Sequence, residues 1–122
     1  MKKLLAIGMI LLSTSAWAEW VLFGKTNDGE LFYLDPTTIR GADVRRIWTL
    51  TIQKGNGKGS SFKVFWELDC KDGRLRSISA QIFSDTEGNN LLRKSDTPSE
   101  WSYPAPQSIK SELFSLVCGK AP

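Results

Sequence analysis

The feature that most constrains the fold is an alternation of apolar and polar side chains over residues 61–70. The even positions carry Phe62, Val64, Trp66, Leu68 and Cys70. Successive side chains of a β-strand point to opposite faces of a sheet, so this pattern predicts a strand with one buried face. The odd positions are mainly polar, although Phe65 is among them. We therefore expect a strand whose core face ends in a cysteine.

Other segments share the two-residue period and extend the prediction to a sheet. Residues 44–53 place Val44, Trp48, Leu50 and Ile52 on one side and Arg45, Thr49, Thr51 and Gln53 on the other. Residues 74–83 carry Ile78, Ala80 and Ile82 in one register. Segments 20–24 and 30–34 flank an Asn-Asp-Gly turn signal at 27–29, and a weaker strand is expected at 91–94. These segments predict about six antiparallel strands.

The length of the loop between segments 61–70 and 74–83 follows from which positions of the two segments are apolar. A three-residue loop over 71–73 gives the pairs Phe62–Ile82, Val64–Ala80 and Trp66–Ile78, which keep apolar residues together. Such a loop requires a left-handed residue at Gly73, a conformation open to glycine without steric cost. In this register Leu75 and Phe83 fall on the opposite face.

The period changes near the C-terminus. Ile109, Leu113, Leu116 and Val117 recur at helical spacing, which predicts an amphipathic helix from residue 106 or 108 to about 119. Residues 95–106 are rich in proline, serine and acidic groups, so we expect an irregular connection anchored by Trp101 and Tyr103. The predicted fold class is α+β, mostly β, with one antiparallel sheet and a C-terminal helix packed on one face.

The first 18 residues have the three parts of an export signal. A basic start (Met1, Lys2, Lys3) precedes an apolar run over 4–12 and a small-residue site that ends at Ala18. The apolar run is shorter than the roughly 20 residues that cross a bilayer. We therefore predict a signal peptide at 1–18, one domain at 19–122, no stable membrane anchor, and a periplasmic or secreted location. No cysteine follows the cleavage site, so no lipid anchor is expected there.

Cleavage would also change the charge of the chain. It leaves 122 minus 18, or 104, residues, with 14 Lys and Arg against 13 Asp and Glu, a net charge of +1 instead of +3. A near-neutral domain without a basic stripe gives no reason to expect nucleic acid as a partner.

The two cysteines, Cys70 and Cys118, are expected to form a disulfide. Export places them in an oxidising compartment, and two cysteines allow one connectivity. Closing a loop of about 48 residues would stabilise the fold by roughly 4 kcal/mol in the chain-entropy model. The bond would hold the C-terminal helix on the core face of the sheet. A metal or redox site is the weaker interpretation, because histidine and a Cys-x-x-Cys spacing are both absent from the sequence.

Residues that resemble catalytic groups have simpler explanations. Glu67 and Asp69 lie two apart on one strand face, and we interpret them as solvated charges. The glycine-rich segment 55–60 lacks the spacing of a phosphate-binding loop and precedes a strand, so we interpret it as a hairpin loop. No histidine is available as the base of a catalytic triad. The sequence therefore predicts no catalytic residue, no cofactor and no metal site.

Several segments together resemble one family. They are Trp20-Val21-Leu22-Phe23-Gly24-Lys25, Asp28-Gly29, Tyr33-Leu34-Asp35-Pro36, Ile39-Arg40, Phe65-Trp66-Glu67-Leu68-Asp69-Cys70, Glu100-Trp101 and Val117-Cys118. In order and spacing, over residues 19–118, the chain resembles the surface-adhesin protein E family. The resemblance implies a bacterial envelope protein with a curved sheet and a disulfide-held helix. It also implies adhesion to host matrix and plasma proteins such as vitronectin, laminin and plasminogen.

We therefore expect an exported protein-binding module and not an enzyme. The candidate contact residues are Arg45, Arg46, Phe65, Arg74 and Arg76. Exposed Phe65, Leu75 and Phe83 would also favour self-association into a homodimer. The arginines can equally be ordinary solvated charges. A second hypothesis is a soluble periplasmic accessory or inhibitor protein that binds a protein of an envelope complex.

Overall fold

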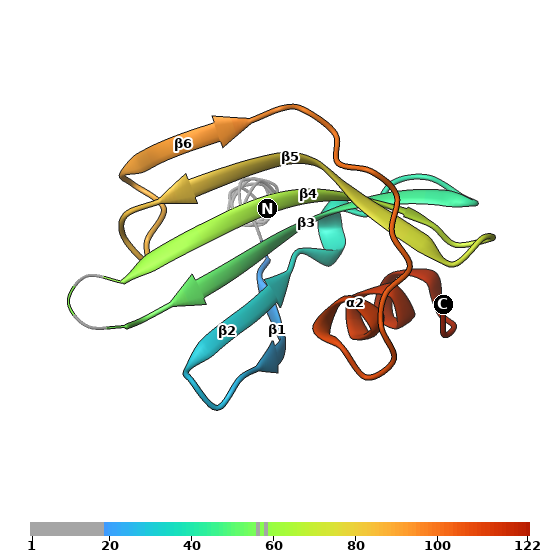
Figure 1. Cartoon of the computed structure of the whole chain (residues 1–122), viewed down its shortest axis with the longest axis horizontal. Coiled ribbons are helices and arrows are strands. Elements are labelled where there is room, and N and C mark those ends of the chain that lie inside the picture. The colour runs from blue at the N-terminus through green and yellow to red at the C-terminus, as the bar shows by residue number, and fades with distance from the viewer. Residues whose placement is uncertain (1–18, 56, 58) are drawn as a thin grey trace, which may run out of the picture.

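The computed structural model describes residues 19–55, 57 and 59–122, so the predicted signal peptide and part of the glycine-rich loop lie outside the described residues. Six strands form one open antiparallel sheet in the order of the sequence (Figure 1). The elements are β1 (Val21–Lys25), β2 (Glu30–Leu34), the 3-10 turn η1 (Pro36–Thr38), β3 (Val44–Gln53), β4 (Ser60–Asp69), β5 (Arg74–Phe83), β6 (Leu91–Ser95) and the helix α2 (Ile109–Cys118). The predicted mostly-β architecture is confirmed.

The core lies between α2 and the concave face of the sheet, which we call the inner face (Figure 1). It consists of Leu34, Ile47, Leu68 and Leu75 from four successive strands and Leu113, Phe114 and Val117 from the helix. The helix begins after Ser108, whose side chain accepts a hydrogen bond from Ser111 N, and ends at the left-handed Gly119. The predicted apolar stripe is buried at Leu113 and Val117, whereas Leu116 is 51% exposed.

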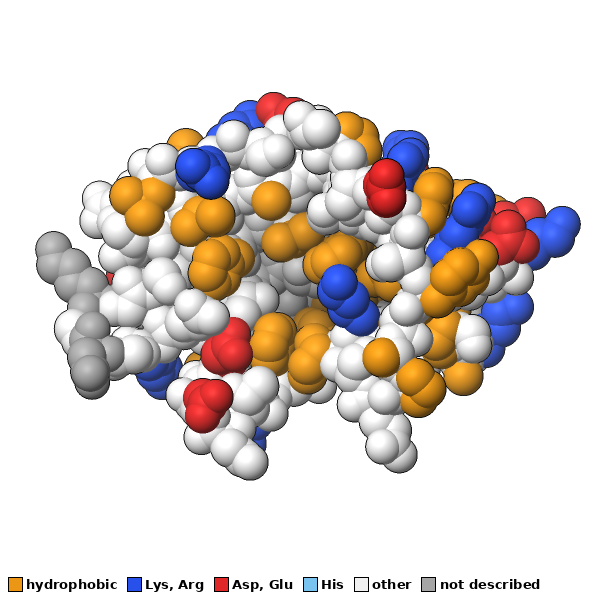
Figure 2. Space-filling view, viewed as in Figure 1, with side chains coloured by type: hydrophobic (Ala, Val, Ile, Leu, Met, Phe, Trp, Pro, Cys, Tyr) orange, Lys and Arg blue, Asp and Glu red, His pale blue; other side chains and the backbone are white. Residues whose placement is uncertain are grey.

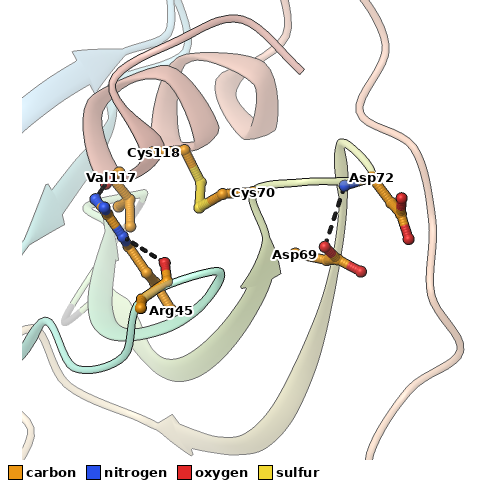
Figure 3. Close-up of a disulfide and its surroundings, with 7 residues drawn as sticks. Arg45, Asp69, Cys70, Asp72, Val117 and Cys118 are labelled. Carbon is orange, nitrogen blue, oxygen red and sulfur yellow. Dashed lines mark hydrogen bonds between the residues drawn. A yellow bond between two sulfur atoms is a disulfide. The ribbon is translucent and has the colours of Figure 1, made fainter.

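The predicted disulfide is present. Cys70 directly follows β4 and Cys118 ends α2, with their Cα atoms 5.5 Å apart (Figure 3). Beside the bond, Arg45 donates a hydrogen bond from Nη1 to Val117 O at 2.7 Å and another from Nε to Ala42 O at 3.0 Å. One covalent bond and one charged hydrogen bond therefore fasten the last turn of the helix to the sheet.

The faces of β3 differ from the expectation that its apolar side, with Trp48, Leu50 and Ile52, faces the core. Ile47 is fully buried in the core and pairs with Trp66, so the odd positions of β3 face the helix. Thr49 also lies on this face, and its hydroxyl accepts a hydrogen bond from Trp66 Nε1 at 2.9 Å. The expectation was wrong because the more apolar side of β3, with Trp48 and Leu50, lies away from the helix, and Ile47 is the β3 residue that enters the core.

The register between β4 and β5 matches the prediction only in part. The pairs Phe62–Ile82 and Val64–Ala80 are confirmed, but Trp66 pairs with Ser77 because a β-bulge leaves Ile78 as an extra residue. The connection is one residue longer than predicted, since Asp69 pairs directly with Arg74. Gly73 has the predicted positive φ, at 74°.

The bulge explains the two apolar residues that the predicted register left on the opposite face. It shifts the parity of the first half of β5, so that Leu75 lies opposite Leu68 and is fully buried in the core. Phe83, beyond the bulge, stays on the convex face, which we call the outer face, and is buried there beneath Lys63, whose Nζ lies 5.3 Å from the ring centroid. Neither residue supplies the exposed apolar surface expected for self-association.

Candidate binding surface

Three arginines and two carboxylates form a cluster on the outer face of β3, β4 and β5. The antiparallel register places Arg46, Glu67 and Arg76 in one row across the three strands. Arg46 donates a hydrogen bond from Nε to Glu67 Oε2 at 3.0 Å, and its Nη2 forms an ion pair with the same oxygen at 2.8 Å. Arg76 donates a hydrogen bond from Nε to Oε1 at 2.9 Å, and its Nη2 forms an ion pair with that oxygen, also at 2.9 Å. Both oxygens of the buried Glu67 carboxylate are therefore paired with guanidinium groups.

A second row reinforces the first. Asp69 and Arg74 are paired in register, with Arg74 Nε 3.1 Å from Asp69 Oδ2. The guanidinium carbons of Arg74 and Arg76 lie 4.6 and 4.5 Å from the ring centroid of Trp101. An indole face attracts cations through its quadrupole, so Trp101 holds both side chains in place. Three guanidinium groups against two carboxylates leave the cluster with one net positive charge.

The contacts of the two carboxylates keep them ionised. Burial alone would raise the pKa of Glu67, but the hydrogen bonds and charges of Arg46 and Arg76 outweigh it, and the pKa is lowered from its ordinary value. The backbone N–H of Asp72, followed by Arg74, lowers the pKa of Asp69. A carboxyl group of this kind cannot act as a general acid near neutral pH. The pair is therefore an electrostatic anchor and does not form an acid–base couple.

An aromatic pair lies on the same face next to the charged row. Trp48 and Phe65 are partners across β3 and β4, and their rings stack with centroids 4.8 Å apart and planes at 18°. A shallow depression of about 270 Å³ borders Trp48 and also contacts Trp20 and Lys63. We define the outer patch as Arg46, Trp48, Phe65, Arg74 and Arg76.

The structure brings together four of the five predicted contact residues. Arg46, Phe65, Arg74 and Arg76 share the outer face, whereas Arg45 faces the helix and is engaged with its C-terminal carbonyl. Adjacent residues of a strand point to opposite faces, so Arg45 and Arg46 cannot contact the same partner surface.

Two aromatic residues of this surface were not among the predicted contact residues. Trp48 was assigned to the core side of its strand, and Trp101 was expected only as an anchor for its segment. The alternation of β3 held the signal for Trp48, since it shares a face with Arg46. Tyr103, the other expected anchor, is 72% exposed.

Comparison with known proteins places the chain in a family. The family model described as surface-adhesin protein E matches residues 20–119. The chain belongs to the surface-adhesin protein E family. A comparison with curated proteins found no match.

Among solved structures, crystal form II of Haemophilus influenzae protein E has a similar fold. The TM-score is 0.63 at 12% sequence identity, and the match covers 87% of this chain and 91% of the other. At this identity the likeness shows a shared fold alone. In the part of the chain that the structure describes, no helix has the length and apolar character needed to cross a membrane. Within that same part, no group of three or more Cys, Asp and Glu side chains has the geometry of a metal site.

Proposed function

We propose that the chain is an exported protein-binding module that acts as an adhesin for host matrix or plasma proteins. The observation that carries the proposal is the outer patch, where a stacked Trp48–Phe65 pair adjoins three ordered arginines. Tryptophan and arginine are enriched among the residues that supply most of the binding energy at protein interfaces. Membership of a surface-adhesin family supports the same class of function.

The geometry of the patch also indicates what kind of partner it suits. The Arg46 side chain is 53% exposed and directs its Nε and Nη2 atoms at Glu67, which leaves other N–H donors available to a partner. Its guanidinium is held in place before binding, so little side-chain entropy is lost on contact. We therefore propose a partner surface with an apolar anchor beside an acidic group.

Binding to immobilised vitronectin, laminin and plasminogen, measured by surface plasmon resonance, tests the aromatic part. Phe65→Ala and Trp48→Ala should each weaken binding by about tenfold or more, as expected for central aromatic anchors. The matched control is Leu92→Ala, which removes an apolar side chain that is 67% exposed on β6 and outside the patch. Equal losses in the control and the patch variants would contradict the proposal.

A second variant with its matched control tests the contribution of the arginines in the outer patch. Arg46→Gln should slow association and reduce its dependence on salt, because a guanidinium at the surface steers an acidic partner. Lys94→Gln removes a cation of similar exposure, 51%, from β6 and should leave association unchanged. Unchanged association of the Arg46 variant would remove the arginines from the proposed contact.

We also propose that residues 1–18 direct export and are removed after Ala18, which leaves residues 19–122 as the working domain. The start of the family match at residue 20 supports this boundary. N-terminal sequencing of the exported protein should begin at Glu19, and a protein that retains Met1 would contradict it.

A further inference from the structure

The inner face contains a cavity that the outer patch does not explain. It lies between the first turn of α2 and strands β1 to β4, has a volume of about 190 Å³, and has mainly apolar walls that include Phe23, Phe32, Val64, Trp66, Ile109 and Leu113. Figure 2 views this face and shows hydrophobic side chains around a hollow near its centre, with a basic side chain at the rim. An engineered apolar cavity of roughly 150 Å³ stays dry and binds benzene, so this volume suits a single aromatic ring.

The walls of the cavity are fixed by contacts on opposite sides. Trp66 donates its indole N–H to Thr49 Oγ1 at 2.9 Å, which satisfies the only polar atom of that side chain. On the side of β1, a Cβ atom at Gly24 would lie 2.8 Å from Ile109 Cδ1, so glycine permits the strand and the helix to approach this closely. A site whose walls are already placed binds a ligand with less ordering cost.

A positively charged side chain lies at the mouth of the cavity. Lys110, the second residue of α2, places Nζ 5.6 Å from the centroid of the Trp66 ring. Among residues 19–55, 57 and 59–122, no carboxylate oxygen lies within 4.0 Å of Lys110 Nζ, the distance limit for an ion pair. Glu30, which lies on the same face, accepts a hydrogen bond from Gln53 Nε2 at 2.8 Å. An aromatic slot with an uncompensated ammonium group is complementary to a ring that carries an anionic group.

We infer that this cavity is a binding site for a small aromatic carboxylate, with the ring between Trp66 and Ile109 and the carboxylate at Lys110. The site is on the face opposite the outer patch, so it is independent of the proposed adhesion and can fail or succeed alone.

An NMR titration of the exported chain with 3-phenylpropionate tests the inference, read on the methyl groups of Val64, Ile109 and Leu113. We expect saturable shifts, and weaker binding of the neutral 3-phenylpropanol. Lys110→Gln should weaken the carboxylate about three- to fivefold and leave the alcohol unchanged, because it removes one exposed charge pair. Lys120→Gln, which removes a cation beyond the other end of the helix, should change neither ligand.

A filling variant completes the test. Val64→Phe adds volume inside the cavity on a strand where aromatic residues are well tolerated, and it should abolish the shifts of Ile109 and Leu113. An unchanged disulfide and a similar melting temperature show that the variant is folded. Absence of saturable binding, equal effects of the two lysine variants, or full binding by a folded Val64→Phe protein would each overturn the inference.

Discussion

At the scale of single residues, Glu67 organises the outer patch. It is 5% exposed, yet it is charged, because Arg46 and Arg76 each donate a hydrogen bond and form an ion pair with one of its oxygens. Both arginines were predicted from the sequence as separate candidate contact residues, but the carboxylate between them was interpreted as solvated. Only the register of three strands reveals that these residues form one row, and no local pattern encodes that register.

Glu67→Gln should destabilise the protein by about 1–2 kcal/mol at neutral pH, since charged hydrogen bonds are lost while both guanidinium groups remain partly solvated. The folded-state pKa of Glu67 lies below its ordinary value of 4.5, so its contribution is complete above that value and is lost as the pH falls through the folded-state pKa. Urea unfolding at a series of pH values checks this. The gap between wild type and variant should narrow below about pH 4, and a constant gap would contradict the account.

Trp101 should stabilise the backbone hydrogen bonds next to it. Its ring lies beneath Arg74 and Arg76, and the adjacent Ser102 exchanges backbone hydrogen bonds with Leu75, each at 2.9 Å. Trp101→Ala should therefore increase amide hydrogen exchange at Leu75 and Ser102 by about tenfold, the loss expected for a cation–π contact of 1–2 kcal/mol. Tyr103→Ala, which removes an exposed aromatic side chain two residues away, is the control and should leave both rates unchanged.

At the scale of elements, the sequence predicted where strands and helix lie better than which faces they bury. The helix, the first hairpin and Gly73 were predictable because each has a local signal: a period, a turn triplet or a steric requirement. The faces of β3 were not, because the helix covers the less apolar side of the strand, where Ile47 enters the core, and not the side with Trp48. The bulge at Ile78 was not predictable either, since it depends on how β5 fits its partner.

The N-cap of α2 gives a prediction at this scale. Ser108 Oγ accepts a hydrogen bond from Ser111 N at 3.1 Å, which satisfies one of the free N–H groups of the first turn. Ser108→Ala should lower the free energy of unfolding by about 1 kcal/mol. Ser115→Ala, in the middle of the same helix, should be neutral or slightly stabilising because alanine has the higher helix propensity. Equal destabilisation by both changes, measured by thermal melting, would show that the cap is unimportant.

At the scale of the whole molecule, the two faces of the sheet carry different features. The inner face carries the helix, the core and the disulfide, whereas the outer face of β3 to β5 carries the aromatic pair and the charged rows. A small domain has limited apolar area to bury, so a covalent link between helix and sheet supplies a large part of its stability. The helix and the disulfide thus lie on the face opposite the proposed contact surface, where Glu67 makes its own contribution to stability.

Cys118→Ser should lower the free energy of unfolding by roughly 4 kcal/mol, the chain-entropy value for the 48-residue separation. The loss should be visible as a lower midpoint of chemical denaturation. A double variant that also replaces Cys70 by serine distinguishes the lost bond from the effect of a reactive free thiol, and should have the same midpoint. An unchanged midpoint in the double variant would show that the bond does not stabilise the domain.

The most direct test of the proposed adhesin role is protease treatment of intact producing cells, followed by osmotic release and detection of the chain in each fraction. A displayed adhesin should be degraded on intact cells, while a periplasmic marker protein in the same cells stays whole. If the chain is protected until osmotic release, it is not displayed. That outcome would contradict adhesion and favour a periplasmic accessory protein.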